Sequence, residues 1–350
     1  MDLQSPPRLD RLEDLRALKV DPGRLYSATH EEILGGWTTD IYFLKTRDVL
    51  RAAGRLDVPV TAEIFARQEG VFAGLGEVLS LLDRKGTDLA VEALPEGESF
   101  ASKEVLVRIR GTYEAFGLYE TVLLGMLASS TGWATAARRC VEAAEGLPVI
   151  CFGSRHVHPA VAPVMERAAV VGGCVDASCI LGAKLLGKDP KGTIPHAAIL
   201  LAGDTVELAR VYDGLLPEGE PRTVLVDTFK DEAEEALRVA EALGDRLSAV
   251  RLDTPGERGG VTPDLVREVR YRLNLAGYGH VAVLVSGGLS PDRIRLLAEA
   301  GAAGFGVGSY ITHATPRDMT MDLKEVDGKP VAKRGRLPGP LPNERLKRVR

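Results

Sequence analysis

The chain has 350 residues, of which 45% are hydrophobic and 27% are charged, a balance typical of a globular protein with room for a main domain and a smaller one. Its 44 basic and 49 acidic residues give a net charge of -5, which excludes a nucleic-acid-binding surface built on overall basicity. No stretch approaches the roughly 18 apolar residues of a membrane span. The N-terminus lacks the basic and apolar segments of a signal peptide, so we expect a cytoplasmic protein.

The first part of the chain is expected to form a small β-rich α+β domain. Residues 58–67 (VPVTAEIFAR) and 103–111 (KEVLVRIRG) alternate apolar with polar side chains, which is typical of strands, and PEGE at 95–98 supplies a turn. We place this domain at residues 1–112. The tail at 316–350 is punctuated by Pro and Gly and is expected to return to it.

A second domain is expected over residues 113–315. Its first segment, 114–145, carries apolar side chains at helical spacing that are interrupted near Thr131 and Gly132, which predicts two consecutive helices. From residue 147 onward, short β-rich runs alternate with amphipathic helices, a pattern typical of a parallel sheet covered by helices. The predicted strands lie at 147–154, 173–179, 191–200, 222–229, 247–254, 280–288 and 302–309, and the predicted helices include 159–171, 231–244, 263–277 and 291–301.

This alternation predicts an α/β fold whose parallel sheet forms a TIM-like barrel, incomplete or irregular, although a doubly wound open sheet would alternate in the same way. Polar or glycine residues accompany each predicted strand, and in a barrel these positions share the rim where such folds build active sites. Single positions have simpler explanations, because an Asp after a strand often caps a helix and a Gly often turns the chain. The rim residues are Arg155, Asp176, His196, Asp227, Asp253, Ser286 to Gly288 and Gly306 to Ser309.

Glycine-containing turns follow the last two predicted strands, in VSGGLS at 285–290 and GVGS at 306–309. Glycine allows backbone amides to approach an oxyanion, and the helix N-terminus after the first turn adds partial positive charge. Two tight turns without a ligand are the alternative. The predicted phosphate site consists of Ser286, Gly287, Gly288, Gly306, Gly308 and Ser309.

Asp227 and Asp253 follow neighbouring predicted strands and are candidates for catalysis and for a metal. Paired carboxylates at such positions hold Mg²⁺ or accept hydrogen bonds from ribose hydroxyls. Helix capping is the alternative, but each Asp is followed by a Thr that would be the better neutral cap. We therefore expect Mg²⁺ as a cofactor.

Basic residues near the rim indicate an anionic substrate. In GSRHVHP, the planar guanidinium of Arg155 suits a carboxylate, and His156 lies next to it, although a surface helix start explains the histidines of this motif equally well. Lys184 follows Asp176 and is a candidate for binding pyrophosphate, with an ordinary exposed lysine as the alternative. His196 lies in an apolar run, where a histidine is usually a hydrogen-bonded core residue.

Several ordered motifs resemble those of nicotinate phosphoribosyltransferases. They are GSRHVHP, GGCVDASCILGAKLLGKDPKGTIPHA, VDTFKDE, RLDTPGERGG, VSGGLS and GVGS, together with TTDIYFLKT at 38–46. The resemblance covers about residues 30–312 and is greatest to the short, archaeal-like members, which are related to quinolinate phosphoribosyltransferase. It implies that nicotinate and phosphoribosyl pyrophosphate are converted to nicotinate mononucleotide and pyrophosphate in NAD biosynthesis.

The resemblance also implies roles for individual residues. Tyr42 would stack on the nicotinate ring from a neighbouring subunit, which implies a homodimer or a multiple of dimers. Arg155 would bind the carboxylate of nicotinate. His196 would be phosphorylated by ATP, making ATP a co-substrate, and would act in catalysis with Asp227 and Asp253.

Two other functions are compatible with the same residues. Quinolinate phosphoribosyltransferase acts on a substrate with a second carboxylate, which is lost during the reaction, and its pocket needs additional positive charge. Arg155, His156 and His158 offer that charge. A non-catalytic phosphosugar-binding barrel would keep the phosphate turns and leave the strand-end carboxylates unused.

Overall fold

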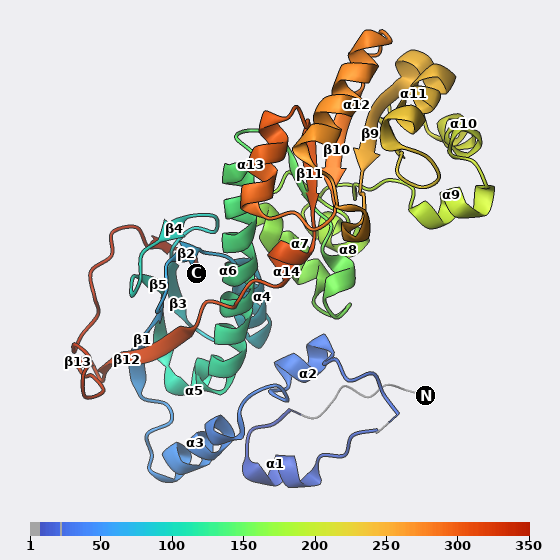
Figure 1. The fold of residues 1–350 in the computed structure, drawn as a ribbon. Helices are drawn as coiled ribbons and strands as arrows, with labels where there is room; N and C mark the ends of the chain where they lie inside the picture. Colours follow the sequence, from blue (N-terminus) through green and yellow to red (C-terminus); the bar gives the residue numbers. More distant parts are fainter. Residues whose placement is uncertain (1–7, 22) are drawn as a thin grey trace. The chain divides into compact units, whose positions relative to one another are not determined.

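The computed structural model of the chain describes residues 8–21 and 23–350. They divide into two compact units, one formed by the chain up to Gly132 together with Thr315–Arg350, and the other by Trp133–Ala314. Figure 1 shows the helices and strands of both units. Residues 1–7 and 22 of the domain expected over residues 1–112 lie outside the described part. Within that part, no helix is long and apolar enough to cross a membrane.

The first unit is built on an antiparallel sheet in the order β13-β12-β1-β5-β3-β14, with a separate pair β2-β4. Its strands are β1 (Pro59–Ala66), β2 (Gly70–Val71), β3 (Ala90–Ala93), β4 (Ser99–Phe100), β5 (Val105–Thr112), β12 (Met319–Val326), β13 (Lys329–Pro330) and β14 (Lys347–Arg348). Its helices are α1 (Leu12–Ala17), α2 (His30–Leu34), α3 (Ile41–Ala52), α4 (Leu75–Lys85), α5 (Tyr113–Phe116) and the 3-10 turn η1 (Gly117–Tyr119), and α6 (Glu120–Ala143) continues into the second unit.

The alternating segments of the first unit form paired strands, as predicted. β1 pairs with β5 on one side and with β12 on the other, so the C-terminal segment is part of this sheet. The apolar core of the unit includes Ile64 of β1 and Val107 of β5, together with Leu82 of α4. Helix α4 lies between β1 and β5 in sequence, and the alternating pattern of these segments does not predict it.

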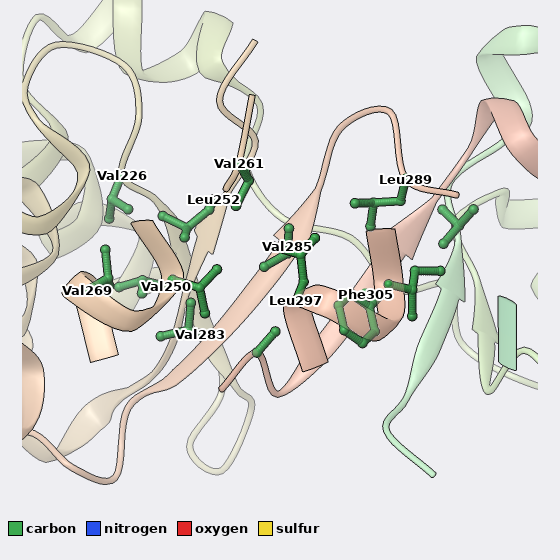
Figure 2. Close-up of a cluster of buried hydrophobic side chains, with 14 of the residues drawn as sticks. Val226, Val250, Leu252, Val261, Val269, Val283, Val285, Leu289, Leu297 and Phe305 are labelled. Atoms are coloured by element: carbon green, nitrogen blue, oxygen red, sulfur yellow. The ribbon is translucent and has the colours of Figure 1, made fainter. Parts of the chain in front are cut away.

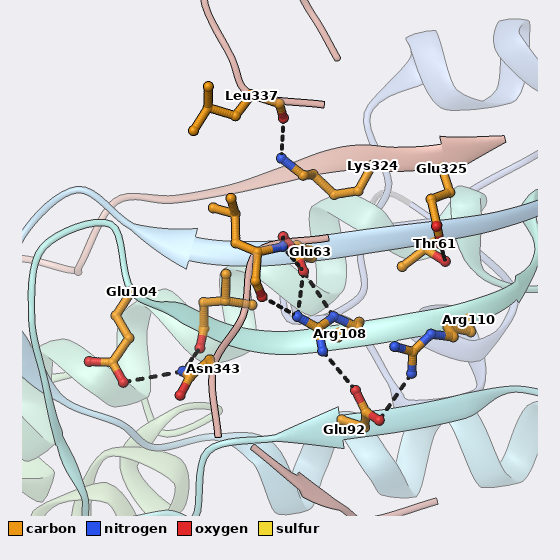
Figure 3. Close-up of polar contacts among 12 residues, drawn as sticks. Thr61, Glu63, Glu92, Glu104, Arg108, Arg110, Lys324, Glu325, Leu337 and Asn343 are labelled. Atoms are coloured by element: carbon orange, nitrogen blue, oxygen red, sulfur yellow. Dashed lines mark hydrogen bonds and ion pairs between the residues drawn. The ribbon is translucent and has the colours of Figure 1, made fainter. Parts of the chain in front are cut away.

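A buried ion pair joins the central strands of this sheet (Figure 3). Nε and Nη2 of Arg108 on β5 lie 2.8 and 2.7 Å from Oε1 of Glu63 on β1, whose side chain is 1% exposed. Arg108 also pairs with Glu92 on β3 at 3.0 Å. The backbone amide of Leu341 donates to Glu63 at 3.1 Å. This charge pair therefore links three strands and the C-terminal tail.

Helix α6 is one continuous helix of 24 residues, so the expected break near Thr131 and Gly132 is wrong. A Cβ at Gly132 would lie only 2.6 Å from the carbonyl oxygen of Thr315. Glycine at this position permits a close backbone approach and does not end the helix. The contact is made by a residue distant in the sequence, so the local pattern carries no sign of it.

The second unit holds a parallel sheet in the order β7-β6-β11-β10-β9-β8. Its strands are β6 (Val149–Cys151), β7 (Asp176–Ala177), β8 (Arg222–Leu225), β9 (Leu247–Leu252), β10 (Ala282–Ser286) and β11 (Gly304–Val307). β7 and β8 are its two edges, so the barrel is not closed and the curled sheet forms a half barrel. The expected α/β fold, with an irregular TIM-like barrel and a separate β-rich domain, is confirmed.

Helices cover one face of this sheet, and the four predicted ones are present as α7 (Ala162–Val171), α11 (Glu232–Leu243), α12 (Pro263–Leu275) and α13 (Pro291–Glu299). Figure 2 shows part of the core between these helices and the sheet, in which Val250 and Leu252 of β9 lie near Val269 of α12. The short elements η3 (Gly244–Arg246), η4 (Gly256–Arg258) and α14 (Ser309–Thr312) complete the connections.

Residues 191–200 do not form the expected strand. They form a loop and most of α9 (His196–Ala202), which Pro195 precedes as N-cap and Gly203 ends at a φ of 83°. The helix sequence HAAILLA consists mainly of strong helix formers, and a short apolar run by itself does not distinguish a strand from a helix. With α8 (Ile180–Leu185) and α10 (Thr205–Leu215), α9 occupies the connection from β7 to β8. The sheet therefore has six strands and not seven.

Candidate active site

The face of the half barrel opposite the helices, here called the concave face, carries several of the predicted rim residues. Side chains alternate between the two faces of a strand. On β9, Val250 and Leu252 pack into the helix-covered core, so Arg251 and Asp253 face the concave side. The core position of Val285 on β10 likewise places Ser286 on the concave face.

Arg251, Ser286 and Asp253 form one hydrogen-bonded group. Nε of Arg251 donates to Oγ of Ser286 at 2.8 Å, and this hydroxyl donates to Oδ1 of Asp253 at 2.7 Å. Nη1 of Arg251 donates to Oγ1 of Thr193 at 2.9 Å, and the guanidinium lies 5.0 Å from the ring centre of Phe152. Burial lowers the pKa of Arg251, although Asp253 opposes that change. An arginine in such surroundings keeps its charge and fixes the neighbouring carboxylate.

Asp227 follows β8 and pairs with His196, the first residue of α9. Nε2 of His196 lies 3.0 Å from Oδ1 of Asp227, whose side chain is 1% exposed. Burial raises the pKa of Asp227, while His196 lowers it and Asp253 raises it further. Its other oxygen, Oδ2, is buried and has no hydrogen-bond partner in the described part of the chain. A buried acceptor of this kind suits a donor or a cation brought by a ligand.

Neither Asp227 nor Asp253 caps a helix. The helix after β8 is capped by Asp231, the helix after β9 by Thr262, and the helix after β10 by Ser290. The capping alternative is therefore wrong for both carboxylates.

These two carboxylates suit a Mg²⁺ ion that enters with a phosphorylated substrate. Mg²⁺ keeps several waters and is usually held by one or two carboxylates together with substrate phosphates. Oδ2 of Asp227 has no protein donor in the described residues, and Oδ2 of Asp253 lies 3.6 Å from Nη2 of Arg251. Over residues 8–21 and 23–350, no three His, Cys, Asp or Glu side chains gather so as to hold a metal by themselves. Waters and substrate phosphates would complete the coordination of an ion held by these two carboxylates.

The turn after β10 is shaped by two glycines. Gly287 and Gly288 have φ angles of 90° and 60°, in the left-handed region that favours glycine. A Cβ at Gly287 would lie 3.1 Å from Oδ1 of Asp253, whereas Gly288 has open space beside it. Helix α13 begins just beyond this turn and points its N-terminus toward it.

The end of β11 and the turn after it pack against the loop after β6. A Cβ at Gly306 would lie 2.3 Å from the ring of Phe152. One at Gly308 would lie 2.9 Å from the carbonyl oxygen of Phe152 and 3.1 Å from Nε2 of His156. Packing alone therefore requires both glycines. Ser309 follows as the first residue of α14, and the phosphate contacts expected of this turn stay predictions.

Positive and titratable side chains gather beside the concave face. Arg155 and His156 are exposed in the 3-10 turn η2 (Ser154–His156) after β6. The rings of His156 and His313 meet edge to face with centroids 6.3 Å apart. Burial lowers the pKa of His156, and the charges of Arg155 and His313 lower it further. Arg155 also acts electrostatically on Arg251, so the charge of Arg155 reaches both the concave face and the histidine pair.

Three other predicted site residues have different surroundings. Asp176 is the first residue of β7 and lies 3.6 Å from Nζ of Lys188. Lys184 on α8 is 58% exposed and forms an ion pair with Asp189. Tyr42 lies on α3 in the first unit, where its side chain is largely exposed. The roles expected of these residues stay predictions.

Arg251 is the candidate that sequence reasoning missed. Its signal is the RLD sequence, in which a charged residue stands two positions before Asp253 in an apolar strand. Two positions in a strand share a face, so the side chain of Arg251 had to point toward the same site as Asp253. Thr193 belongs to a loop and carries no comparable signal.

Comparison with known families agrees with this geometry. Residues 40–131 match the N-terminal domain of quinolinate phosphoribosyl transferase. Residues 133–322, more than half of the chain, match the C-terminal domain of the same family. The chain belongs to the quinolinate phosphoribosyltransferase family.

Individual relatives in this family carry two kinds of name. Nicotinate phosphoribosyltransferase pncB1 of Mycobacterium tuberculosis is 31% identical over 339 residues, covering 85% of this chain and 74% of its own length. A probable nicotinate-nucleotide pyrophosphorylase (carboxylating) of Methanothermobacter thermautotrophicus is 23% identical, covering 76% and 88%. The crystal structure of nicotinate-nucleotide pyrophosphorylase from Pyrococcus furiosus is 45% identical with a TM-score of 0.84, covering 90% of this chain and 81% of that one.

These findings correct the expectation of an ATP-coupled nicotinate phosphoribosyltransferase. Both domains match the quinolinate family, and the solved structure at 45% identity is named a nicotinate-nucleotide pyrophosphorylase. The quinolinate alternative is therefore favoured, the ligase class is wrong, and the phosphoribosyltransferase class is retained. The error has a chemical reason. Strand-end carboxylates, a glycine turn and an arginine serve phosphoribosyl transfer to any pyridine carboxylate, so motifs made of them do not identify the acid.

Proposed function

We propose that the chain is a quinolinate phosphoribosyltransferase, which converts quinolinate and phosphoribosyl pyrophosphate to nicotinate mononucleotide, pyrophosphate and CO₂. The observation that carries this proposal is the group of positive and titratable side chains beside the concave face. The charge of Arg155 acts on both His156 and Arg251. Two carboxylates on neighbouring ring carbons need such a group, because a single arginine neutralises only one of them.

The exposed guanidinium of Arg155 has the freedom to bind a substrate carboxylate through two parallel hydrogen bonds. Arg251 is held in place by Ser286 and Thr193, which makes it a fixed positive charge in a partly buried site. Desolvation lowers the pKa of His156, and the charges of Arg155 and His313 lower it further. The ring nitrogens of His156 are available for a hydrogen bond to the acid. We further propose that Tyr42 stacks on the ring from a second copy of the chain.

The carboxylates and the glycine turn would hold phosphoribosyl pyrophosphate. Asp227, oriented by His196, and Asp253, oriented by Ser286, accept hydrogen bonds from the ribose hydroxyls. The 5′-phosphate binds at the turn of Gly287 and Gly288 and the start of α13. Asp176 and Lys184 are further candidates for contacts to the substrate. Asp227 and Asp253 would hold Mg²⁺, which would supply positive charge to offset the charge of the leaving group.

The chemistry needs positioning and charge more than it needs a protein nucleophile. The lone pair of the ring nitrogen forms a bond to the anomeric carbon while the bond to pyrophosphate breaks and its electron pair leaves with that group. The carboxylate on the ring carbon next to the nitrogen then departs as CO₂. Its electron pair stays on that carbon beside the positively charged nitrogen, and the carbon takes a proton from water.

Purified chain incubated with phosphoribosyl pyrophosphate and Mg²⁺ should form nicotinate mononucleotide from quinolinate, with one CO₂ released for each nucleotide. ATP should not increase the rate. Asp253→Asn serves as the control for contaminating activity, because it keeps the size of the side chain and removes the charge. Product from nicotinate but not from quinolinate would overturn the proposal, and so would a chain that binds the substrates without turnover.

We also propose that the chain forms a homodimer or a multiple of dimers. The exposed side chain of Tyr42 is available for a second copy, and closed dimers are the commonest assembly of soluble proteins. Light scattering should give at least twice the mass of the 350-residue chain. A monomer at the concentration of the activity assay would contradict the role given to Tyr42.

A further inference from the structure

Glu166 on α7 is fully buried and accepts hydrogen bonds from two loops of the half barrel. Oγ of Ser154 and Oγ of Ser178 donate to its Oε1 at 2.7 and 2.8 Å. The backbone amide of Cys179 donates to its Oε2 at 2.6 Å. A carboxylate removed from water requires such partners, so Glu166 and the loops hold one another in place.

The two loops depend on Glu166 to different degrees. The loop after β7 makes two of the contacts, through the hydroxyl of Ser178 and the amide of Cys179. The loop after β6 makes one, through Ser154. Ser154 is the first residue of η2 and directly precedes Arg155. Losing the hydroxyl of Ser154 would therefore remove the contact between Glu166 and the loop after β6. Losing the hydroxyl of Ser178 would leave the loop after β7 anchored through the amide of Cys179.

We propose that Glu166 is a positioning residue for the binding of the pyridine acid. Through Ser154 it fixes η2, and η2 presents the guanidinium of Arg155 to a substrate carboxylate. A two-point guanidinium–carboxylate contact depends strongly on orientation. This inference rests on the proposed function for the role of Arg155. It deepens that function by assigning acid affinity to a buried residue that does not touch the acid.

Ser154→Ala and Ser178→Ala form a matched pair, because each removes one hydroxyl from the same carboxylate oxygen. We expect Ser154→Ala to raise the Kd and the KM for the acid about three- to tenfold, the effect of one lost hydrogen bond. The KM for phosphoribosyl pyrophosphate and kcat should change less than about twofold. Ser178→Ala should leave the Kd for the acid within about twofold of the wild type, because Cys179 still anchors its loop.

Glu166→Gln provides the conservative comparison. Its carbonyl oxygen can face the amide of Cys179, and its NH₂ group can donate to the two serine hydroxyls, which also act as acceptors. We therefore expect this variant to keep the wild-type affinity for the acid. Glu166→Ala should lower the affinity for the acid at least as much as Ser154→Ala does. A melting curve for each variant shows that the chain is folded.

The Kd is measured by calorimetry with quinolinate and with nicotinate separately, without turnover. If nicotinate alone binds, the proposed function fails, yet the two serine variants must still differ in their affinity for nicotinate. Equal effects of Ser154→Ala and Ser178→Ala would overturn the inference. So would a folded Glu166→Ala variant with wild-type affinity, or a wild-type chain that binds neither acid.

Discussion

Ser286→Ala tests the hydrogen-bonded group on the concave face. The residue is 3% exposed, and its hydroxyl stands between Nε of Arg251 at 2.8 Å and Oδ1 of Asp253 at 2.7 Å. Its removal leaves two charged groups each without one partner. A hydrogen bond to a charged group contributes about 1.5–3 kcal/mol. If the transition state loses the stabilisation of one such bond, kcat/KM falls about ten- to hundredfold, since each factor of ten corresponds to about 1.4 kcal/mol.

The measurement is kcat/KM for phosphoribosyl pyrophosphate at saturating quinolinate, with a melting curve alongside. Thr262→Ala is the control, because Thr262 caps α12 and contacts neither Arg251 nor Asp253. Losing that cap should cost about 1 kcal/mol of stability and leave kcat/KM near the wild-type value. A Ser286→Ala variant with wild-type kcat/KM refutes the role given to the group. Equal losses in the two variants would refute it as well, since they would reflect stability alone.

Three further predictions concern charge and burial. Burial and a neighbouring carboxylate raise the pKa of Glu120 from 4.5 to about 7, so the fold binds this proton more tightly than the unfolded chain, and the stability it contributes is lost as pH rises through about 7. The full change corresponds to roughly 3 kcal/mol, reduced to about 1–2 by partial exposure. Glu120→Gln should therefore make the denaturation midpoint less dependent on pH between pH 5 and 8. A pH dependence equal to that of the wild type would contradict this. Arg108→Met should lower the free energy of unfolding by about 3–5 kcal/mol because it leaves Glu63 buried and unpaired. Arg110 in the same strand is exposed, so Arg110→Met should lower the free energy of unfolding by less than about 1 kcal/mol in the same denaturant titration. Equal losses of stability in the two variants would contradict the different weights given to the buried and the exposed ion pair. Asp227→Asn should lower kcat about a hundredfold or more without lowering the melting temperature at pH 7, because burial raises the pKa of Asp227 and makes its ionised form unfavourable. A clearly lower melting temperature would contradict that reasoning.

The strands and helices that depend on local pattern were predictable. The helices of the second unit have sustained apolar periodicity, and their existence follows from it. The run at 191–200 forms a loop and a helix in place of the predicted strand, because its apolar residues are too few to separate the two periods and Pro195 is the N-cap of a helix there. Gly132 does not break α6, since this glycine accommodates a backbone contact with Thr315. Contacts between residues distant in sequence leave no periodic trace.

For the site, the sequence by itself determined the chemistry available at each strand end. Asp227, Asp253 and the glycines of 287–288 are visible because a polar or glycine residue that ends an apolar strand stands out. Only the tertiary structure decided which of them lie in contact. It placed Arg251 against Ser286 and Asp253 and paired His196 with Asp227. It also placed Glu166 behind the loop of Arg155. Such pairings depend on the order of strands in the sheet, which local sequence does not encode.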